Sequence, residues 1–596
     1  MRSLDEGKSW EDQTPKFINF RAISTIYSAR SADGSYVVYF ISSGGRYWIS
    51  EDNGETYLAY EGLPDFSEML FHPTQPKDYV IGLTTNRNAR HDFWLAVDGE
   101  WVKVMSDLPS YTKVAWASFE NSHPNRIYVI ADSKSDGVFD GEIFYSDDFF
   151  KTQKKIPNLV GVYRWYMVPP FQFVIASCIT VNTACDTKVL SISEDGGNTF
   201  SQVVFPDDKK ETTQEQDFDV YELADQTIWV HVSRSCLSDF CWGDIFHSYA
   251  ADQQFTLSLK YQKNEDFTKY NSVNGIYIAN QYITPGRAPI SSDNVRTLIT
   301  FNKGGEWNLI EAPAIDSRGQ PTNCFVNASC SLHIHGWTSN LPFFTYFYSV
   351  PNAIGIMIAT GNIGSYLSKR SQDINTYISF NGGVHWKEIT KGAWIPEIGD
   401  HGSIITILQQ TQETNSITYT INGGEEWSNC VFSNSTIKVS NIRVSDGWDQ
   451  KQFLVYGVRT TGNTKSSVII HLDFDSAFSG KCDYPSDFEP WSPSDEHGHC
   501  VLGARINYMR RTTGKTCYFG EDHEHTSFVE NCTCNLDDFE CDHCFYRPDL
   551  NSPCELECMV PNLPPEPSYC KNSTDQHKLS YSVPMGYRLL DGDTCL

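Results

Sequence analysis

The chain has 596 residues, of which 40% are hydrophobic and 14% aromatic, and its formal net charge is −28. The apolar content is ample for a folded core, but no run of about 18 apolar residues is available to span a membrane. A surface this acidic, without a cluster of Lys or Arg, argues against nucleic acid as a partner and leaves basic peptides or proteins as plausible ones.

An octet of residues recurs along the chain from its first residues onward. Its pattern is Ser/Thr-x-Asp/Asn-x-Gly-x-Ser/Thr-aromatic, with Glu or His in the seventh place of the later copies. The six copies begin at Ser3, Ser50, Ser193, Thr300, Ser379 and Thr420. A short Asp or Asn side chain can bond the amides of a turn, Gly tolerates positive φ, and the final aromatic can pack between neighbouring sheets. The octet resembles the β-hairpin staple known as the Asp box, so it predicts scaffold rather than an active site.

The spacing of the octets predicts the architecture. The copies at Ser3 and Ser50 are 47 residues apart. Degraded copies lie at Val97–Trp101, Ser146 and Ser248–Phe255. The chain then holds nine octet-bearing units, and Ile437–Asp475 has room for a tenth unit without an octet. Units of about 40 to 50 residues with four short strands each are typical of propeller blades.

Short apolar runs within these units predict strands. Tyr36–Ile41, Arg126–Ile130 and Gln452–Tyr456 are rich in β-branched and aromatic residues, and no stretch keeps a 3.6-residue period, so helices should be few. We therefore expect an all-β chain, with a ten-bladed β-propeller with Asp-box hairpins over residues 1–475 and a small disulfide-rich module over residues 476–596. Because Met1 falls almost on an octet, the first blade should be incomplete and the chain a fragment of a longer protein.

The cysteines are unevenly distributed. There are none before Cys178, seven from there to Cys430, and eleven from Cys482 onward. Three close pairs predict local loop disulfides: Cys178/Cys185, Cys236/Cys241 and Cys324/Cys330. Glycosylation sequons lie at Asn327, Asn434, Asn531 and Asn572. Clustered cysteines and sequons together indicate an oxidising luminal or extracellular compartment.

Residues 476–596 contain too little periodic apolar sequence for a conventional core, so disulfides should hold this module together. The spacing Cys532-x-Cys534 followed by Cys541-x-x-Cys544 could instead be a zinc site. Eleven cysteines beside sequons fit disulfides better than thiolate ligands. We expect neither a metal nor a cofactor.

Several phrases carry a resemblance to a known family. They are Cys330-Ser331-Leu332-His333-Ile334-His335, Pro351-Asn352-Ala353-Ile354-Gly355, Cys500-Val501-Leu502-Gly503, Asp538-Phe539-Glu540-Cys541-Asp542 and Gly586-Tyr587-Arg588. On these residues the chain resembles the luminal domain of the sortilin family of sorting receptors, which in fungi includes the vacuolar protein sorting receptor. The octets extend the resemblance to the start, so it covers nearly the whole chain.

The resemblance implies the luminal part of a single-pass membrane receptor, truncated at both ends. It implies a propeller tunnel that binds peptide or protein cargo, a bracing ten-cysteine module and a transmembrane helix missing from this chain, and it allows a homodimer. Such a receptor carries soluble hydrolases or peptides from the Golgi to the endosome, vacuole or lysosome and is not an enzyme. Cys544 and Cys558 are additional to the family's cysteines and are expected to bridge each other.

The resemblance also points to a ligand-binding segment. Animal sortilin carries an arginine just before a Gly-aliphatic-Tyr-Ile strand, where it grips the carboxylate of a peptide's last residue, and Asn274 takes that place here. Asn lacks the charge and the bidentate fork, so an internal peptide motif is expected in place of a carboxy terminus. The predicted ligand-binding residues are Phe267, Ser272, Asn274 and Ile276. The alternative, an inner strand without a ligand role, remains open.

Four histidines in the module offer a pH switch. His497, His499, His523 and His525 lie among acidic residues, and protonation between about pH 7 and 5 would add positive charge there. The alternative is that they are solvated loop histidines.

Two other classes of function stay open. Sialidases and some glucanases also contain Asp boxes, so a secreted, sialidase-like glycoside hydrolase is the main alternative. Hydrolysis needs two carboxylates facing each other across a cleft, or an arginine triad for a sialic acid, and no such constellation stands out in the sequence. An extracellular adhesion module is the third reading, separated from a receptor only by the missing tail.

Overall fold

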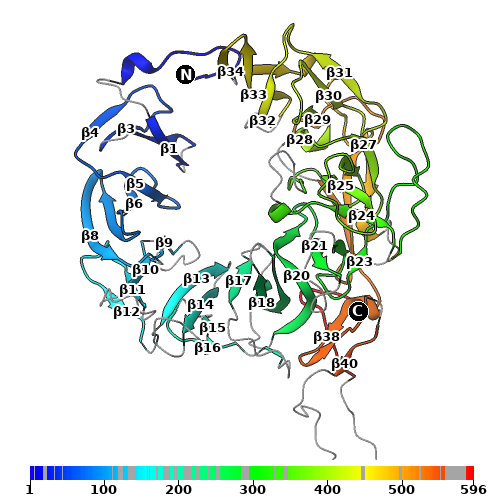
Figure 1. Cartoon of the computed structure of the whole chain (residues 1–596), viewed down its shortest axis with the longest axis horizontal. Helices are drawn as coiled ribbons and strands as arrows, with labels where there is room; N and C mark the ends of the chain where they lie inside the picture. The colour runs from blue at the N-terminus through cyan, green and yellow to red at the C-terminus, as the bar shows by residue number, and fades with distance from the viewer. Residues whose placement is uncertain are drawn as a thin grey trace, which may run out of the picture. The chain divides into compact units, whose positions relative to one another are not determined.

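In the part of the chain that the computed structural model describes, the regular secondary structure is almost entirely β-strand (Figure 1). That part is residues 1–596 except 6, 18–22, 32–33, 43–44, 111, 118–124, 132–140, 158, 160, 169–171, 179–187, 194, 196, 204, 207–216, 222–226, 238–239, 250–254, 284–293, 328, 340–346, 445–449, 495–497, 499, 522–524, 551 and 557–584. Short 3-10 helices accompany the strands: η1 (Thr14–Lys16), η2 (Trp337–Ser339), η3 (Asp400–Gly402), η4 (Asp475–Ala477) and η5 (Leu536–Asp538). The predicted all-β class is confirmed.

The chain divides into two compact units, which are described separately. The first comprises Met1–Val204, Thr213–Trp229 and Ser248–Gln254, and the second Phe205–Thr212, Val230–His247 and Phe255–Leu596.

Four antiparallel sheets of four strands each make up most of the first unit, and in each sheet the strands follow chain order. The sheets are β1 (Ile23–Arg30), β2 (Tyr36–Ser42), β3 (Arg46–Ser50) and β4 (Leu58–Glu61); β5 (Phe66–Phe71), β6 (Tyr79–Thr85), β7 (His91–Val97) and β8 (Glu100–Leu108); β9 (Val114–Trp116), β10 (Ile127–Ala131), β11 (Glu142–Ser146) and β12 (Lys154–Lys155); and β13 (Val162–Val168), β14 (Gln172–Cys178), β15 (Lys188–Ser193) and β16 (Ser201–Gln202).

The following strands keep the same antiparallel order. One seven-stranded sheet contains β17 (Phe218–Tyr221), β18 (Thr227–Leu237), β19 (Phe240–Tyr249), β20 (Thr256–Lys269), β21 (Tyr277–Tyr282), β22 (Val295–Thr300) and β23 (Asn308–Leu309). Two four-stranded sheets contain β24 (Ser331–Ile334), β25 (Met357–Gly364), β26 (Asn375–Ser379) and β27 (Lys387–Lys391), and β28 (Trp394–Gly399), β29 (Ile404–Gln409), β30 (Ser416–Thr420) and β31 (Ser428–Val431). A three-stranded sheet contains β32 (Lys438–Val444), β33 (Gln452–Thr461) and β34 (Thr464–Asp473).

The predicted number of ten blades is not confirmed. Before the module, the described strands form eight sheets. One reason is the length of β20, whose fourteen residues pair with β19 toward its start and with β21 toward its end. Two four-stranded patterns thereby merge into one continuous sheet.

Within a unit, consecutive sheets bury their faces against each other. Strand β10 shows this best, because all five of its residues are buried. Val129 packs in a cluster with Phe93 of β7, whereas Tyr128, on the opposite face, packs with Trp165 of β13. Since side chains alternate along a strand, a strand covered on both faces appears in the sequence as a continuous apolar run.

From Ser50 onward, the undegraded octets link the last two strands of their sheets. In the copy that joins β3 to β4, the Ser50 hydroxyl accepts the N–H of Gly54 at 2.7 Å. The Asp52 carboxylate accepts both the N–H of Thr56 at 2.9 Å and its hydroxyl at 2.6 Å. Asn53 and Gly54 have φ values of 57° and 83°, so the turn needs two successive left-handed residues, which Asn and Gly tolerate best.

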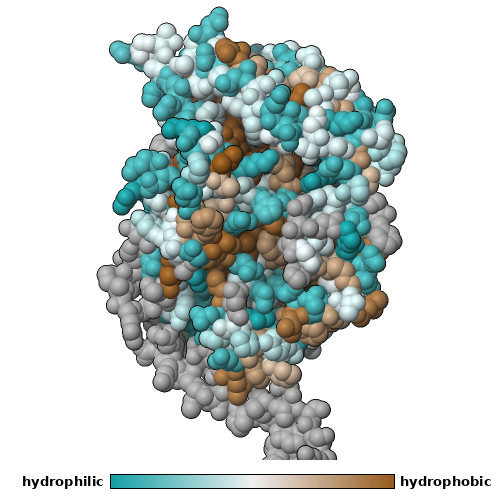
Figure 2. All heavy atoms as spheres, turned by 90° about the vertical axis from the view of Figure 1, so that its right-hand side faces the viewer, coloured by the Kyte–Doolittle hydropathy of each residue, from teal (hydrophilic) through white to brown (hydrophobic). Residues whose placement is uncertain are grey.

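The disulfide-rich module begins after β34 and contains three small sheets. They are β35 (Phe488–Trp491), β36 (Ala504–Arg511) and β37 (His525–Asn531); β38 (Phe539–Cys541) and β41 (Tyr587–Leu589); and β39 (Phe545–Tyr546) and β40 (Glu555–Leu556). On the face of the second unit that Figure 2 shows, apolar atoms lie in a band among hydrophilic ones.

Candidate functional site

The predicted ligand-binding segment lies at the end of β20 and the turn into β21. Phe267 is 6% exposed and stacks on Tyr277, with ring centroids 5.5 Å apart. Ile276 is fully buried in the core, and the Ser272 hydroxyl donates to the backbone carbonyl of Val350 at 2.7 Å. Of the four, Asn274 alone is exposed. These residues therefore do not share one surface: three shape the turn that presents Asn274.

All the cysteines of the module that the structure describes are in disulfides. The disulfides are Cys482–Cys517, Cys500–Cys532, Cys534–Cys595 and Cys541–Cys554, and Cys324–Cys330 closes a loop before β24. Cys178 and Cys544 are also disulfide-bonded. Cys185 and Cys558 lie outside the described residues, as do the side chains of Cys236 and Cys241. Because Cys532, Cys534, Cys541 and Cys544 are all in disulfides, the alternative of a zinc site built from these thiolates is wrong.

Three predicted glycosylation sites are exposed: Asn327, Asn434 and Asn531. Asn572 lies outside the described residues. Of the four histidines of the predicted pH switch, His497, His499 and His523 and the side chain of His525 also lie outside them.

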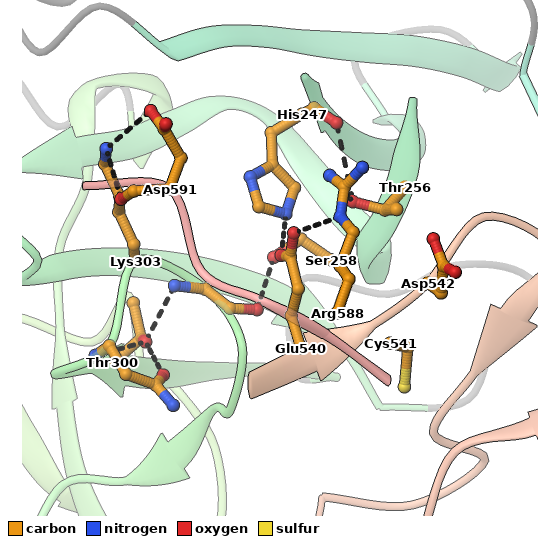
Figure 3. A network of polar contacts seen from close by, with 12 residues as sticks. His247, Thr256, Ser258, Thr300, Lys303, Glu540, Cys541, Asp542, Arg588 and Asp591 are labelled. Atoms are coloured by element: carbon orange, nitrogen blue, oxygen red, sulfur yellow. Dashed lines mark hydrogen bonds and ion pairs between the residues drawn. The ribbon is translucent and has the colours of Figure 1, made fainter. Parts of the chain in front are cut away.

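A buried polar network joins the module to the seven-stranded sheet (Figure 3). At its centre is Glu540 of β38, whose Oε2 lies 2.6 Å from Nε2 of His247 on β19. Arg588 of β41 donates through Nε to Oε1 of the same carboxylate at 2.6 Å and through Nη2 to the Thr256 hydroxyl of β20 at 3.0 Å. The side chains of His247 and Glu540 are 1% and 3% exposed. A carboxylate so deeply buried is stable only when paired and hydrogen-bonded, so these contacts hold the module in one position on the sheet.

The octet at Thr300–Trp307 makes the next contacts of this network. Nδ2 of Asn302 donates to the backbone carbonyl of Asp537 at 3.0 Å. Lys303 places Nζ 3.3 Å from the carbonyl oxygen of Asp591 and 3.6 Å from its carboxylate. Lys303 holds a φ of 57° and is almost fully buried, so a side chain is retained at a left-handed position where it reaches the module.

Two other octets receive arginines from β36. Nη1 of Arg510 donates to the backbone carbonyl of Phe380 at 2.6 Å, and Nη1 of Arg511 donates to that of Ile421 at 2.8 Å. Phe380 and Ile421 are the second residues of their octets. All three undegraded octets of the second unit are therefore docking points for the module.

A buried aspartate fixes the module beside the sheet β28–β31. Asp400 accepts the N–H groups of Phe519 and Gly520 at 2.6 and 2.7 Å. Burial raises the pKa of Asp400 despite these two hydrogen bonds. The ring of His401 stacks on that of Phe519, with centroids 4.2 Å apart. Sequence reasoning missed these residues, although Asp400-His401 stands directly after strand β28.

A cavity of about 510 Å³ opens beside the network. It is lined by β20, β22, the octet at Thr300–Trp307 and the module segment 540–552. Its cationic side chains are Lys260, Arg296 and Arg547, and its aromatic ones include Trp307 and Tyr546. The cavity can accommodate a small ligand or a short peptide segment.

Two family models match the chain in succession. The model described as sortilin, neurotensin receptor 3, matches residues 1–442, and the model of its C-terminal part matches residues 445–596. The chain belongs to the sortilin family. The resemblance drawn from the octets and the cysteine phrases is thus confirmed.

Curated relatives include animal and fungal proteins. The human Sortilin-related receptor is 28% identical over 100% of this chain and 27% of its own length. The Vacuolar protein sorting/targeting protein 10 of Debaryomyces hansenii is 30% identical over 79% of this chain and 30% of its own length. The chain therefore spans less than a third of either relative.

Among solved structures, a xyloglucanase of Xanthomonas campestris covers 82% of this chain and 83% of its own, with a TM-score of 0.29 and 10% identity. A likeness this weak supports no inference. In the part of the chain that the structure describes, none of the helices has the length and apolar character needed to cross a membrane.

Proposed function

We propose that this chain is the luminal, cargo-binding part of a sorting receptor that carries soluble hydrolases or peptides from the Golgi to the endosome, vacuole or lysosome. We also propose that its sheets are blades of a ten-bladed propeller whose tunnel holds the cargo. The observation that carries the proposal is the unbroken succession of the two sortilin models along the chain. The disulfides and exposed sequons support a luminal address.

Asn274 is the residue that we propose for cargo contact in the predicted segment. Its exposed amide can both donate to and accept from the backbone of an internal peptide motif, whereas the buried Phe267 and Ile276 hold the turn in place.

The glycoside hydrolase alternative gains no support from the second large cavity. This cavity, of about 1130 Å³, is lined by three carboxylates, Asp316, Asp373 and Glu388. Asp316 and Glu388 both bind Lys391, at 3.0 and 2.6 Å. The N–H of Gln320 and then Lys391 lower the pKa of Asp316 to about 2. Hydrolysis requires one carboxyl group with a raised pKa as general acid, and Asp316 is the opposite of that.

A sorting assay tests the receptor proposal. The chain is placed between a signal peptide and a membrane anchor with an endosomal sorting tail, in fungal cells that lack their own Vacuolar protein sorting/targeting protein 10. We expect the secreted fraction of soluble vacuolar hydrolases to fall, whereas the same fusion without the chain leaves secretion unchanged. Undiminished secretion, with the fusion visible in the Golgi and endosomes, would contradict the proposal. Release of product from a sialoside or a glucan by the purified chain would favour the hydrolase alternative.

A further inference from the structure

Beside the module, Arg296 is a cation that forms no ion pair with any carboxylate among the described residues. It lies on β22, lines the cavity of about 510 Å³, and donates through Nε to Oε1 of Gln281 at 2.8 Å. None of the described carboxylates forms an ion pair with its guanidinium. In a chain with a net charge of −28, a half-buried guanidinium without an ion pair is unexpected.

The neighbouring arginine shows the contrast. Arg547 lines the same cavity, but Nη1 is 3.3 Å from the Glu306 carboxylate and donates to the carbonyl of Ser552 at 2.8 Å. In its described part, the cavity thus contains one guanidinium that forms an ion pair with a carboxylate and another that forms none.

Lys260 adds positive charge on the same wall. It lies on β20, and its Nζ is 4.2 Å from the centroid of the Tyr546 ring in the module. The exposed Asp549 is close enough to influence Arg296 electrostatically, without an ion pair. Burial of Arg296 lowers its pKa, which means that its charge is poorly solvated and would gain from an anion.

The rest of the lining suits a chain rather than a single ion. Leu257, Leu259, Leu309, Pro548 and Leu550 supply apolar surface around the two cations. A carboxylate can bond the two terminal nitrogens of Arg296 side by side, while an adjoining aliphatic side chain contacts this surface.

We propose that the cavity between the seven-stranded sheet and the module binds an acidic peptide segment, with Arg296 as the anchor of one carboxylate and Lys260 as a second cation. This site is separate from the segment that contains Asn274. That the ligand is a peptide rests on the proposed function, whereas the choice of a carboxylate rests on Arg296, which lines the cavity and forms no ion pair with a described residue.

The test measures binding of three peptides to the full chain by calorimetry. They are Ac-Leu-Glu-Leu-Pro-NH2, its Gln counterpart, and Ac-Leu-Leu-Pro-OH, whose carboxylate is terminal. We expect the Glu peptide to bind about tenfold or more tightly than the Gln peptide, since a hydrogen bond to a charged group is lost in the latter. The terminal carboxylate of the third peptide shows whether the site accepts either source, and equal binding of the Glu and Gln peptides would overturn the proposal.

Variants locate the binding. Arg296→Gln should weaken binding of the Glu peptide about tenfold, whereas Arg296→Lys should retain part of the affinity. In the unaltered chain, higher salt should weaken binding of the same peptide. The matched control is Arg318→Gln, because Arg318 is an exposed arginine of the second unit that lies outside this cavity. This control should leave the affinity for the Glu peptide unchanged. An Arg296→Gln chain that keeps its thermal midpoint and its affinity would contradict the proposal. Acetate that competes fully with the Glu peptide would reduce the site to a small-anion site and overturn the peptide part.

The sorting assay separates this inference from the proposed function. Hydrolase retention by the fusion without selective binding of the Glu peptide would remove the cavity as a peptide site and leave the receptor proposal in place.

Discussion

The third residue of the octet differs between the two units. In the first unit it is Asp5, Asp52, Asp148 or Asp195, each of which accepts the hydroxyl of the serine or threonine four residues on. In the second unit it is Asn302, Asn381 or Asn422, and the seventh residue is Glu or His, which bonds the Asn side chain through its backbone N–H alone. A carboxylate at the third place of the octet therefore occurs together with a hydroxyl at the seventh place. The amide leaves a donor free for other use, which Asn302 directs at the module.

Octets with Asp in the third place are expected to form turns that keep their stability in mild acid. The Thr152 hydroxyl, its N–H and Ser146 lower the pKa of Asp148 to about 2. A lowered pKa adds stability that is fully present above the ordinary value of 3.8 and is lost only as the pH falls through about 2. We expect the thermal midpoint of Asp148→Asn to lie below that of the unaltered chain by the same amount at pH 7 and pH 5, with the difference shrinking toward pH 3. If the difference in thermal midpoint already disappeared between pH 7 and pH 5, the lowered pKa of Asp148 would be contradicted.

Octet turns in the second unit serve two purposes, as links within a sheet and as docking points. Lys303 departs from the glycines that occupy its position in the other two, Gly382 and Gly423. This departure could have signalled a special role in the sequence, because a side chain at a left-handed position carries a conformational cost. What it contacts, Asp591, could not be inferred from the sequence.

Asn302→Asp should weaken the docking of the module. The change replaces the donor to the Asp537 carbonyl by a carboxylate oxygen, and we expect a loss of about 1 to 3 kcal/mol, measured by hydrogen exchange of the module amides. Asn422→Asp is the matched control: its side-chain oxygen has the same role within its turn, and its Nδ2 has no partner among the described residues. Equal effects of the two changes would show that the turn, and not the docking contact, is responsible.

The assembly of the second unit depends on contacts between residues far apart in the sequence. Arg588 bonds Thr256 across 332 positions, and no local pattern marks either residue as part of a network. The octets, the strands and the family were predictable because their signals are local or repeated. The merger of two patterns at β20 and the burial of Ile276 were not, because they depend on which neighbours cover a strand.

Glu540→Gln should loosen the module more than any surface charge change. It leaves Arg588 and His247 without their buried carboxylate, and breaking such an arrangement costs about 3 kcal/mol or more. The control is Glu489→Gln, whose carboxylate is 36% exposed and 3.7 Å from Arg510, with an expected effect within about 1 kcal/mol. Exchange of the β38 and β41 amides measures both. Similar protection in the two variants would show that the network is not what fastens the module.

The hydrogen bonds that shape each octet turn join residues of the same octet, and this has an evolutionary consequence. Since these bonds lie within eight residues, the length of chain between turns can change without disturbing them. The interval is 41 residues between Ser379 and Thr420 but 79 between Thr300 and Ser379, where the Cys324–Cys330 loop is found. Insertions that diversify ligand preference are therefore expected to accumulate between sheets, while the hairpins that end in an octet keep their length.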